Sequence, residues 1–209
     1  MKYPVERVVF DWSGTISNDI MPVYETNRRI LQRFNLPAKT FEEWKSQIQP
    51  TALDFLAING IQISDADDFA GFFEETYHAV VNDGTKPEIY PEARCIIKCL
   101  KGMKKRIAVI SAHPTSAILR EMREYGLEGL QVPVIGGVKD KSEKLKMLQG
   151  YKEMPSVYVG DMASDIRAAK AAGTYSFAIT GGYHPRRLLE AEEPDELIDS
   201  LSEIPELIK

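Results

Sequence analysis

Short apolar runs that recur along the chain constrain its fold more than any other feature of the sequence. They are rich in β-branched residues, and each is followed by a turn and usually by a helical pattern. The runs cover residues 7–10, 107–110, 132–135, 157–159 and 176–179. This alternation predicts βα units with right-handed crossovers, and therefore an α/β fold with a doubly wound parallel sheet in three layers.

Glycines mark the ends of the helices predicted between the later runs. The helices are expected over residues 115–125, 142–149 and 163–172, and the residues that follow them are Gly126, Gly150 and Gly173. A glycine just beyond a helix end commonly adopts the left-handed conformation that closes the last turn. These signals support the interpretation as repeated βα units.

The spacing of the first two apolar runs indicates an inserted domain. About ninety residues separate them, far more than a βαβ crossover needs. The inserted sequence predicts helices over residues 22–34, 41–48, 52–58 and 65–80. Thr40 and Glu43 form a capping box at the second of these helices. We therefore expect a core domain of residues 1–15 and 89–209, and a small helical domain of residues 16–88.

Composition and charge narrow the classes of partner. The apolar share of 44% and the charged share of 27% are those of an ordinary soluble globular protein, and the net charge of -5 argues against a nucleic-acid surface. No apolar run reaches membrane-spanning length, and the N-terminus lacks the apolar stretch of a signal peptide. We expect a cytoplasmic protein that binds neither nucleic acid nor membrane, and the formation of a homodimer stays open.

The two cysteines are expected to have a packing role. Cys95 and Cys99 lie one helical turn apart, and no second pair of cysteines or histidines completes a zinc site. Free cysteines commonly pack as small apolar groups, and we expect the same of these two.

The segment VVFDWSGT places Asp11 at the carboxyl end of the first predicted strand, where ligand sites form in open α/β sheets. Gly14 and Thr15 follow in a tight turn whose backbone N–H groups can point at an anion, and Thr15 adds a hydroxyl group. An aspartate in this place can also simply cap the turn. The segment alone permits both interpretations.

The second strand end, in the segment IAVISAHP, carries a serine and a histidine. Ser111 would lie beside Asp11 if the two strands are neighbours, and its hydroxyl group could then hold a phosphoryl oxygen. Serine is also common before turns that contain proline, so its presence is weak support on its own. We interpret His113 as a surface residue, with a substrate contact as the alternative.

The segment VYVGDMASDIRAAKAAG carries the strongest single signal. An apolar strand delivers Asp161 into a turn, and Asp165 follows one helical turn later. Two carboxylates at a strand end suit a hard cation, because Mg²⁺ prefers oxygen ligands and usually takes one or two carboxylates together with substrate phosphate. Acids at a helix N-terminus are also favourable by themselves, which explains Asp165 but not Asp161.

A lysine is expected to compensate the negative charge at this edge of the sheet. The segment GGVKDKSEKLKML supplies candidates, and Lys141 is preferred because it starts a predicted helix and leaves its amine free to reach the strand ends. Lys139 and Lys144 are the alternatives.

Together, these motifs resemble those of the haloacid dehalogenase superfamily in type and order. DWSGT is similar to its nucleophile motif, Ser111 to its strand-end hydroxyl residue, Lys141 to its lysine and GDMASD to its acidic motif. The resemblance covers the whole chain, because the helical insertion looks like that family's cap domain and PDELIDSLSEIPELI looks like its final strand and helix. GDMASDIRAAKAAG is especially similar to phosphoglycolate-phosphatase-like members.

The resemblance implies a Rossmann-like core with a helical cap, and a small phosphorylated metabolite as substrate. It implies that Asp11 attacks phosphorus and forms an aspartyl-phosphate, that Lys141 assists, and that Mg²⁺ shields the carboxylate from the phosphate. The implied metal ligands are Asp11, the carbonyl group of Ser13, Asp161 and Asp165. The implied phosphate-binding residues are Trp12, Gly14, Thr15, Ser111, Ala112 and Lys141.

Ser13 departs from the pattern of the phosphatases. They usually carry a second aspartate at this position, which protonates the leaving group and then activates water, and such proton transfer contributes roughly 100-fold to 10,000-fold. A slow alkyl phosphatase or a different substrate follows from its absence. Phosphonoacetaldehyde hydrolases have alanine there, in the similar motif DWAGT, and phosphorylating ATPases have threonine.

Two alternatives to a phosphatase therefore stay open. The first is a hydrolase of carbon–phosphorus bonds with a phosphonate substrate, in which a cap lysine forms an imine with an aldehyde, and Lys45 is the candidate for this lysine. The second is a sensor that retains the phosphate pocket and turns over slowly. The retained Asp11 favours an enzyme, because binding alone does not require a nucleophile.

Overall fold

The computed structural model describes residues 2–49, 51–63, 66–149 and 154–209 of the chain. It divides into two compact units. The first, here called the core unit, comprises Met1–Ser17 and Ile89–Lys209, and the second, the helical unit, comprises Asn18–Glu88. Ile16 and Ser17, which were expected in the inserted domain, group with the core unit. Both residues are fully buried.

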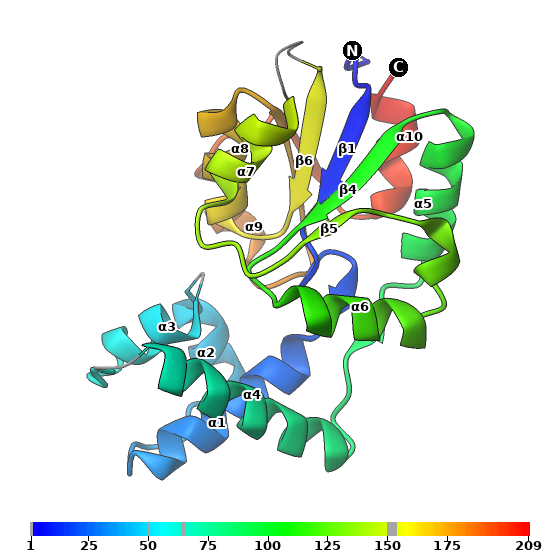
Figure 1. Ribbon diagram of the computed structural model, residues 1–209. Coiled ribbons are helices and arrows are strands. Elements are labelled where there is room, and N and C mark those ends of the chain that lie inside the picture. The colour runs from blue at the N-terminus through cyan, green and yellow to red at the C-terminus, as the bar shows by residue number, and fades with distance from the viewer. Residues whose placement is uncertain (1, 50, 64–65, 150–153) are drawn as a thin grey trace. The chain divides into compact units, whose positions relative to one another are not determined.

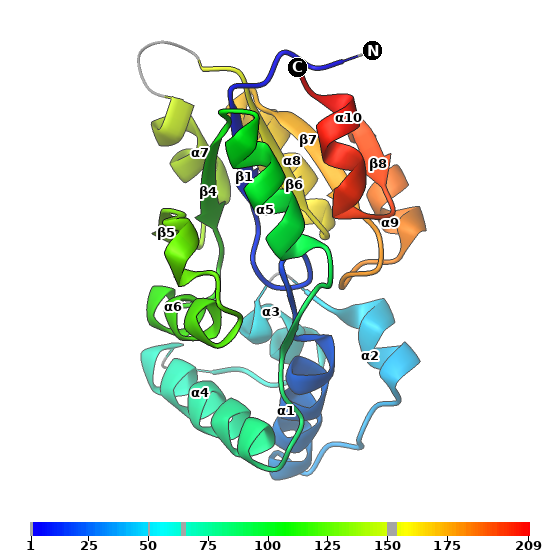
Figure 2. The same ribbon diagram turned by 90° about the vertical axis from the view of Figure 1, so that its right-hand side faces the viewer.

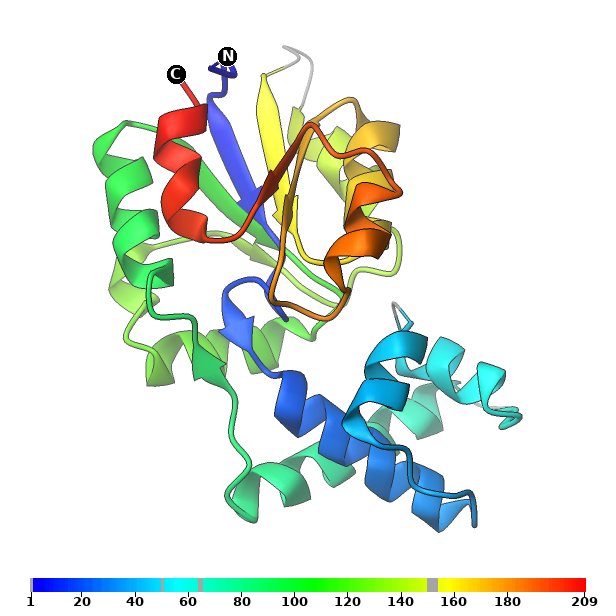
Figure 3. The ribbon, with the colours of Figure 1, turned by 180° about the vertical axis from the view of Figure 1, so that it is seen from behind.

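The core unit is built on a six-stranded sheet in the order β5-β4-β1-β6-β7-β8, and every neighbouring pair is parallel. Figures 1 and 3 show this sheet from opposite sides, with β8 at one edge. The strands are β1 (Arg7–Phe10), β4 (Arg106–Ile110), β5 (Val134–Ile135), β6 (Ser156–Gly160), β7 (Tyr175–Ile179) and β8 (Glu196–Ile198). The doubly wound parallel sheet is therefore confirmed.

Helices cover both faces of the sheet, which confirms the three-layer arrangement. In Figure 1, α7 and α8 lie on one side of the sheet and α5 and α10 on the other, and Figure 2 shows α5 and α10 in front of it. The helices of the core unit are α5 (Ala93–Gly102), α6 (Thr115–Glu124), α7 (Lys141–Gln149), α8 (Ala163–Ala172), α9 (Arg186–Glu190) and α10 (Ile204–Leu207).

The glycine signals are confirmed where the structure describes them. Gly126 has φ 63° after α6, and Gly173 has φ 69° after α8, so both adopt the left-handed conformation that closes a helix. Gly150 lies outside the described residues.

The alternation of side chains along β1 sends consecutive residues to opposite faces of the sheet. Val8 and Phe10 pack into the apolar cluster beneath α5 and α10, whereas Val9 packs into the cluster beneath α7 and α8. The alternation continues past the strand end, because Trp12 joins the cluster of Val8 and Phe10. The Asp11 side chain therefore lies on the opposite face of the sheet, which α7 and α8 cover.

The register of the sheet aligns three strand ends at one edge. Phe10 pairs with Val109 of β4 and with Val159 of β6. Because β1 lies between these strands, the residues that follow all three meet at the point where the strand order reverses, where ligands bind in open α/β sheets.

The helical unit contains α1 (Ile20–Arg33), α2 (Phe41–Gln47), α3 (Ala52–Ile58) and α4 (Ala66–Asn82). The capping box of Thr40 and Glu43 is present at the start of α2. The expected start of the last helix, Ser64 and Asp65, lies outside the described residues. The strands β2 (Ser17–Asn18) and β3 (Glu88–Ile89) pair where the chain leaves and re-enters the core unit. Within the described ranges, no helix is both long and apolar enough to cross a membrane.

The expectation that the cysteines pack as small apolar groups is wrong. Cys95 and Cys99 are both exposed on α5. The buried side of this helix is formed by Ala93, Ile96, Ile97 and Leu100, and positions 95 and 99 lie on the other side.

Candidate active site

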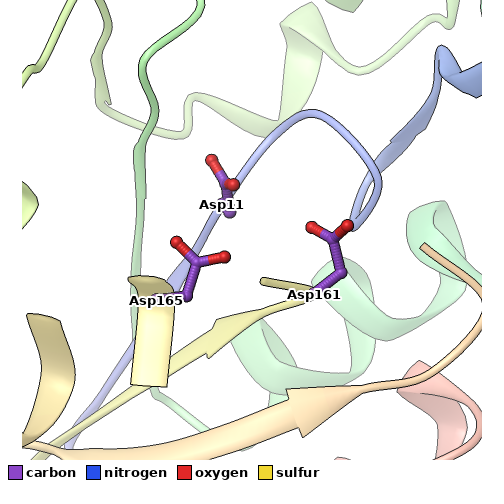
Figure 4. A group of neighbouring side chains, drawn as sticks. All are labelled: Asp11, Asp161 and Asp165. Carbon is purple, nitrogen blue, oxygen red and sulfur yellow. The ribbon is translucent and has the colours of Figure 1, made fainter. Parts of the chain in front are cut away.

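Three aspartates meet where β1 and β6 end. Asp11 follows β1, Asp161 follows β6, and Asp165 lies in the first turn of α8. Each offers a carboxylate oxygen within 4.8 Å of the others, and all three residues are buried. Figure 4 shows the three side chains gathered beside the loop that follows β1. The sequence placed these acids at strand ends, and the structure brings them together.

Lys141 is the lysine that reaches this group. It is the first residue of α7, and its Nζ lies 2.8 Å from Oδ2 of Asp11 and 2.7 Å from Oδ1 of Asp165. The two other candidates lie elsewhere, because Lys139 is exposed and Lys144 reaches the sulfur atom of Met147. Burial by itself would lower the pKa of Lys141, but the charges of Asp11 and Asp165 outweigh burial and raise this pKa well above its usual value.

Two loops enclose the Asp161 carboxylate. Its Oδ1 accepts a hydrogen bond from the Thr15 hydroxyl at 3.1 Å, and its Oδ2 accepts one from the Tyr183 N–H at 2.6 Å. Gly14 and Gly182 pack so closely against this carboxylate that a Cβ atom on either would collide with it. Gly14 also has φ 71°, a conformation that favours glycine.

Several backbone N–H groups of the loop after β1 donate hydrogen bonds to acceptors near this loop. The Trp12 N–H donates to Oδ1 of Asp11 at 2.7 Å. The Gly14 N–H donates to the Ser17 carbonyl at 2.8 Å, and the Thr15 N–H to the Trp12 carbonyl at 3.3 Å. Of the donors expected to bind phosphate, Trp12 therefore lies at the Asp11 carboxylate, whereas Gly14 and Thr15 donate within the turn.

Ser111 directly follows β4, the strand next to β1. It is buried, and its hydroxyl group is close enough to the Asp11 carboxylate to lower the pKa of Asp11, although burial raises this pKa overall. Its oxygen also accepts the N–H of His113 at 3.3 Å, while Ala112 between them is exposed. This loop and the loop after β1 thus meet at one carboxylate.

The interpretation of His113 as a surface residue is wrong. Its side chain is only 18% exposed, and its Nε2 lies 3.3 Å from Oε1 of Glu121, a buried acid on α6. Glu121 is a site residue that the sequence reasoning missed. It was detectable, because α6 buries Ala117, Ile118, Glu121 and Met122, so an acid occupies a position of the apolar face.

The loop of Tyr183 and His184 was also missed. The Tyr183 N–H binds Asp161, and Nδ1 of the buried His184 accepts the N–H of Ala163 at 3.0 Å, at the start of α8. The contact of Tyr183 uses a backbone group, so no side-chain pattern in the sequence signals it.

A family model described as haloacid dehalogenase-like hydrolase matches residues 8–179. The matched region begins in β1 and ends with β7, and it contains the three aspartates and Lys141. The chain belongs to this family.

Two curated relatives are similar to the chain in sequence, and a solved structure is similar in fold. A phosphoglycolate phosphatase of Vibrio vulnificus is 26% identical over 67% of this chain, and the match spans 62% of that protein. A phosphoglycolate phosphatase of Vibrio parahaemolyticus is 22% identical, with 98% of this chain and 96% of the relative covered. A haloacid dehalogenase-like hydrolase of Streptococcus pneumoniae has a similar fold, with a TM-score of 0.78, 13% identity and 97% of each chain covered.

The carboxylates of this haloacid dehalogenase-like site repel one another in a buried place. Burial raises the pKa of Asp161 well above its usual value, and the charges of Asp165 and Asp11 raise it further. Burial also raises the pKa of Asp11, against the opposing charge of Lys141. Among the described residues that contact these acids, Lys141 supplies the cationic group. The three acids and one ammonium leave a negative site that suits a further cation.

We expect Asp161→Asn to stabilise the protein when a chelator keeps divalent cations away. Asparagine can still accept the Tyr183 N–H and donate to the Thr15 hydroxyl, but it carries no charge. Because the folded-state pKa of Asp161 is raised above 3.8, the wild-type protein loses stability as pH rises above that value. The gain should therefore be present at neutral pH and fade in acid.

The measurement is thermal unfolding of both proteins between acidic and neutral pH. A gain of about 1 kcal/mol would raise Tm by about 2–4 °C in a protein of this size. Asp83→Asn, at an exposed carboxylate of the helical unit, is the matched control and should change Tm little. An Asp161→Asn protein that is equally or less stable at neutral pH would contradict the electrostatic account.

Proposed function

We propose that the protein is a Mg²⁺-dependent phosphatase that hydrolyses a small phosphorylated metabolite through an aspartyl-phosphate at Asp11. The observation that carries this proposal is the environment of the Asp11 carboxylate. Its oxygens accept from the ammonium of Lys141 and the N–H of Trp12, and the Ser111 hydroxyl lies near enough to lower its pKa. These donors suit a site in which a phosphoryl group is transferred to the carboxylate. The relatives named phosphoglycolate phosphatase support the same class of substrate.

In the proposed reaction, an oxygen of Asp11 bonds to phosphorus while the bond from phosphorus to the leaving group breaks. Water then attacks the aspartyl-phosphate, which releases inorganic phosphate and restores the carboxylate. Lys141 and Ser111 would orient the phosphoryl oxygens, and the buried setting would strengthen their interaction with the charge that moves during transfer.

The donor set fits Mg²⁺, because it consists of buried oxygen atoms and its charges disfavour ionisation without a cation. We assign the ion to Asp11, the Ser13 carbonyl and Asp161, with Asp165 in support. Both oxygens of Asp165 are already engaged, one with Lys141 and one with the Met162 N–H, so its main task is to hold Lys141. When bound, Mg²⁺ would neutralise charge on the phosphoryl group and on the acids around it.

Ser13 determines which leaving groups suit this site. A serine hydroxyl is neither a useful acid nor a useful base near neutral pH. Alkoxides depart slowly without a proton, whereas aryl oxides and carboxylates depart readily. We therefore propose acyl or aryl phosphates, rather than simple alkyl phosphates, as the better substrates.

A carbon–phosphorus hydrolase is the second candidate, because the DWSGT motif is similar to the DWAGT motif of phosphonoacetaldehyde hydrolases. It would need an imine-forming lysine. Lys45 lies on α2 of the helical unit, with its Nζ 5.7 Å from the centre of the Phe41 ring. Reduction with borohydride in the presence of phosphonoacetaldehyde would trap such an imine, and Lys45→Arg would abolish the trapping.

We expect Asp11→Asn to lower phosphate release from an aryl phosphate by at least about 1,000-fold, because it removes the nucleophile at nearly constant side-chain volume. Circular dichroism should match that of the wild-type protein, and Asp83→Asn in the helical unit should keep wild-type activity. Retention of more than a small fraction of turnover by a folded Asp11→Asn protein would rule out the covalent mechanism.

Ser13→Asp is expected to increase the turnover of alkyl phosphates relative to aryl phosphates by at least about tenfold, because the new carboxyl group can protonate an alkoxide. The ratio should be measured at saturating magnesium, since the added charge also acts on the metal. Ser13→Ala is the matched control, and its ratio should stay that of the wild-type protein. An unchanged or falling ratio in a folded Ser13→Asp protein that still binds metal would favour the carbon–phosphorus hydrolase or the sensor.

A further inference from the structure

Glu121 is a charged residue in the interior of the core unit. It is 3% exposed and lies on the face of α6 that also buries Ile118 and Met122. Taking a carboxylate out of water is costly unless charges and hydrogen bonds compensate it. The partners of this carboxylate therefore matter for its role.

The side chains described in contact with the Glu121 carboxylate all lie on two loops of the proposed site. Its Oε2 accepts from Nε1 of Trp12 at 2.7 Å and from the hydroxyl of Ser17 at 2.9 Å. Its Oε1 lies 3.3 Å from Nε2 of His113. Trp12 and Ser17 stand at the two ends of the loop after β1, and His113 belongs to the loop after β4. One carboxylate thus joins both loops.

Each of these loops reaches the Asp11 carboxylate through one further contact. Trp12 donates its own N–H to Oδ1 of Asp11, so the residue whose indole is held by Glu121 also touches the nucleophile. His113 donates its N–H to the Ser111 oxygen, and Ser111 is close enough to the Asp11 carboxylate to lower its pKa. Any displacement of Glu121 would therefore shift both Trp12 and Ser111, the neighbours of Asp11 on its two sides.

The indole of Trp12 is fixed by packing as well. Trp12 is fully buried on the face of the sheet opposite Asp11, and its ring stacks on Tyr125 with centroids 6.1 Å apart and planes at 19°. The Tyr125 hydroxyl is hydrogen-bonded to Ser17 at 2.9 Å. These contacts give the indole one orientation, in which its N–H points at Glu121.

Glu121 keeps its charge in this setting. Burial by itself would raise the pKa of Glu121, but the contact with His113, followed by the hydrogen bonds of Trp12 and Ser17, outweighs burial and lowers it. Hydrogen bonds to an ionised acceptor are shorter and stronger than neutral ones, and so hold their donors more firmly.

We propose that Glu121 is a positioning residue, whose buried carboxylate connects the loop after β1 to the loop after β4. By holding these two loops in place, it sets the affinity of the site for a phosphoryl group. This inference rests on the proposed function. The inference adds Glu121 to the proposed site as a supporting residue. Its carboxylate contacts the two loops and has no role in binding the substrate or the metal directly.

The test compares Glu121→Gln with the wild-type protein in three measurements on the full chain. Nitrogen-15 NMR of the indole N–H, in a Trp44→Phe background that leaves Trp12 as the remaining tryptophan, reports the contact with residue 121. Calorimetry measures the Kd for inorganic phosphate with Mg²⁺. Steady-state kinetics with an aryl phosphate gives kcat and KM. Glu124→Gln, at an exposed acid on the same helix, is the matched control.

We expect Glu121→Gln to move the Trp12 indole resonance, to raise the Kd for phosphate about tenfold or more, and to lower kcat/KM by a similar factor. Glu124→Gln should leave all three unchanged. If Glu121→Gln fails to fold, Trp12→Phe removes one donor, keeps an aromatic ring, and should raise the same Kd.

A purely structural Glu121 would behave differently. Tm would fall, while the Kd for phosphate and kcat/KM of the folded protein stayed within about twofold of the wild-type values, and this result would overturn the inference. An unmoved indole resonance would also overturn it. Absence of phosphate binding and turnover in the wild-type protein would instead refute the proposed function, and the NMR result would still show whether Glu121 holds Trp12.

Discussion

The convergence of buried carboxylates on Lys141 is the interaction on which the site depends. Asp11 and Asp165 both contact its ammonium, while Asp161 lies close by with no side-chain cation of its own among the described contacts. Burial raises the pKa of Asp161, so the arrangement costs folding free energy at neutral pH. Proteins retain such local costs where function requires them, because selection tolerates lost stability above a threshold. The sheet and the glycines packed on Asp161 hold the arrangement in place.

Because of the parallel sheet, neighbouring residues of one short segment have two separate structural roles. Consecutive residues after β1 point to opposite faces, so Asp11 meets α7 and α8 while Trp12 is buried towards α6. The first side chain supplies the proposed nucleophile, and the second anchors the backbone that touches it. Glu121 then links this anchor to the neighbouring strand end through His113. The chemistry of the site and its mechanical support therefore lie on different sides of the same sheet.

The features of the fold and of the site that could be predicted are those with a local signal in the sequence. Apolar runs, glycines after helices and acids after strands led to the parallel sheet and to Asp11 and Asp161 at its edge. The contacts that depend on tertiary packing could not be predicted from the sequence. The Tyr183 N–H that binds Asp161 has no side-chain signature, and His113 looked exposed because its partner lies on another element. Glu121 did have a local signal, an acid on an apolar helix face, but only the fold shows which loops it holds.

In the proposed mechanism, Asp11 carries the phosphoryl group during turnover. With serine at position 13, no carboxyl group there activates water, so the aspartyl-phosphate should accumulate before it is hydrolysed. The most direct measurement is rapid acid quenching of the protein with an acyl or aryl phosphate and Mg²⁺, followed by mass spectrometry of its peptides. A covalent mechanism at Asp11 predicts a phosphoryl group on the peptide that contains Asp11, formed at least as fast as steady turnover. Steady phosphate release with this peptide unmodified at every quench time, or with the phosphoryl group on another residue, would contradict it.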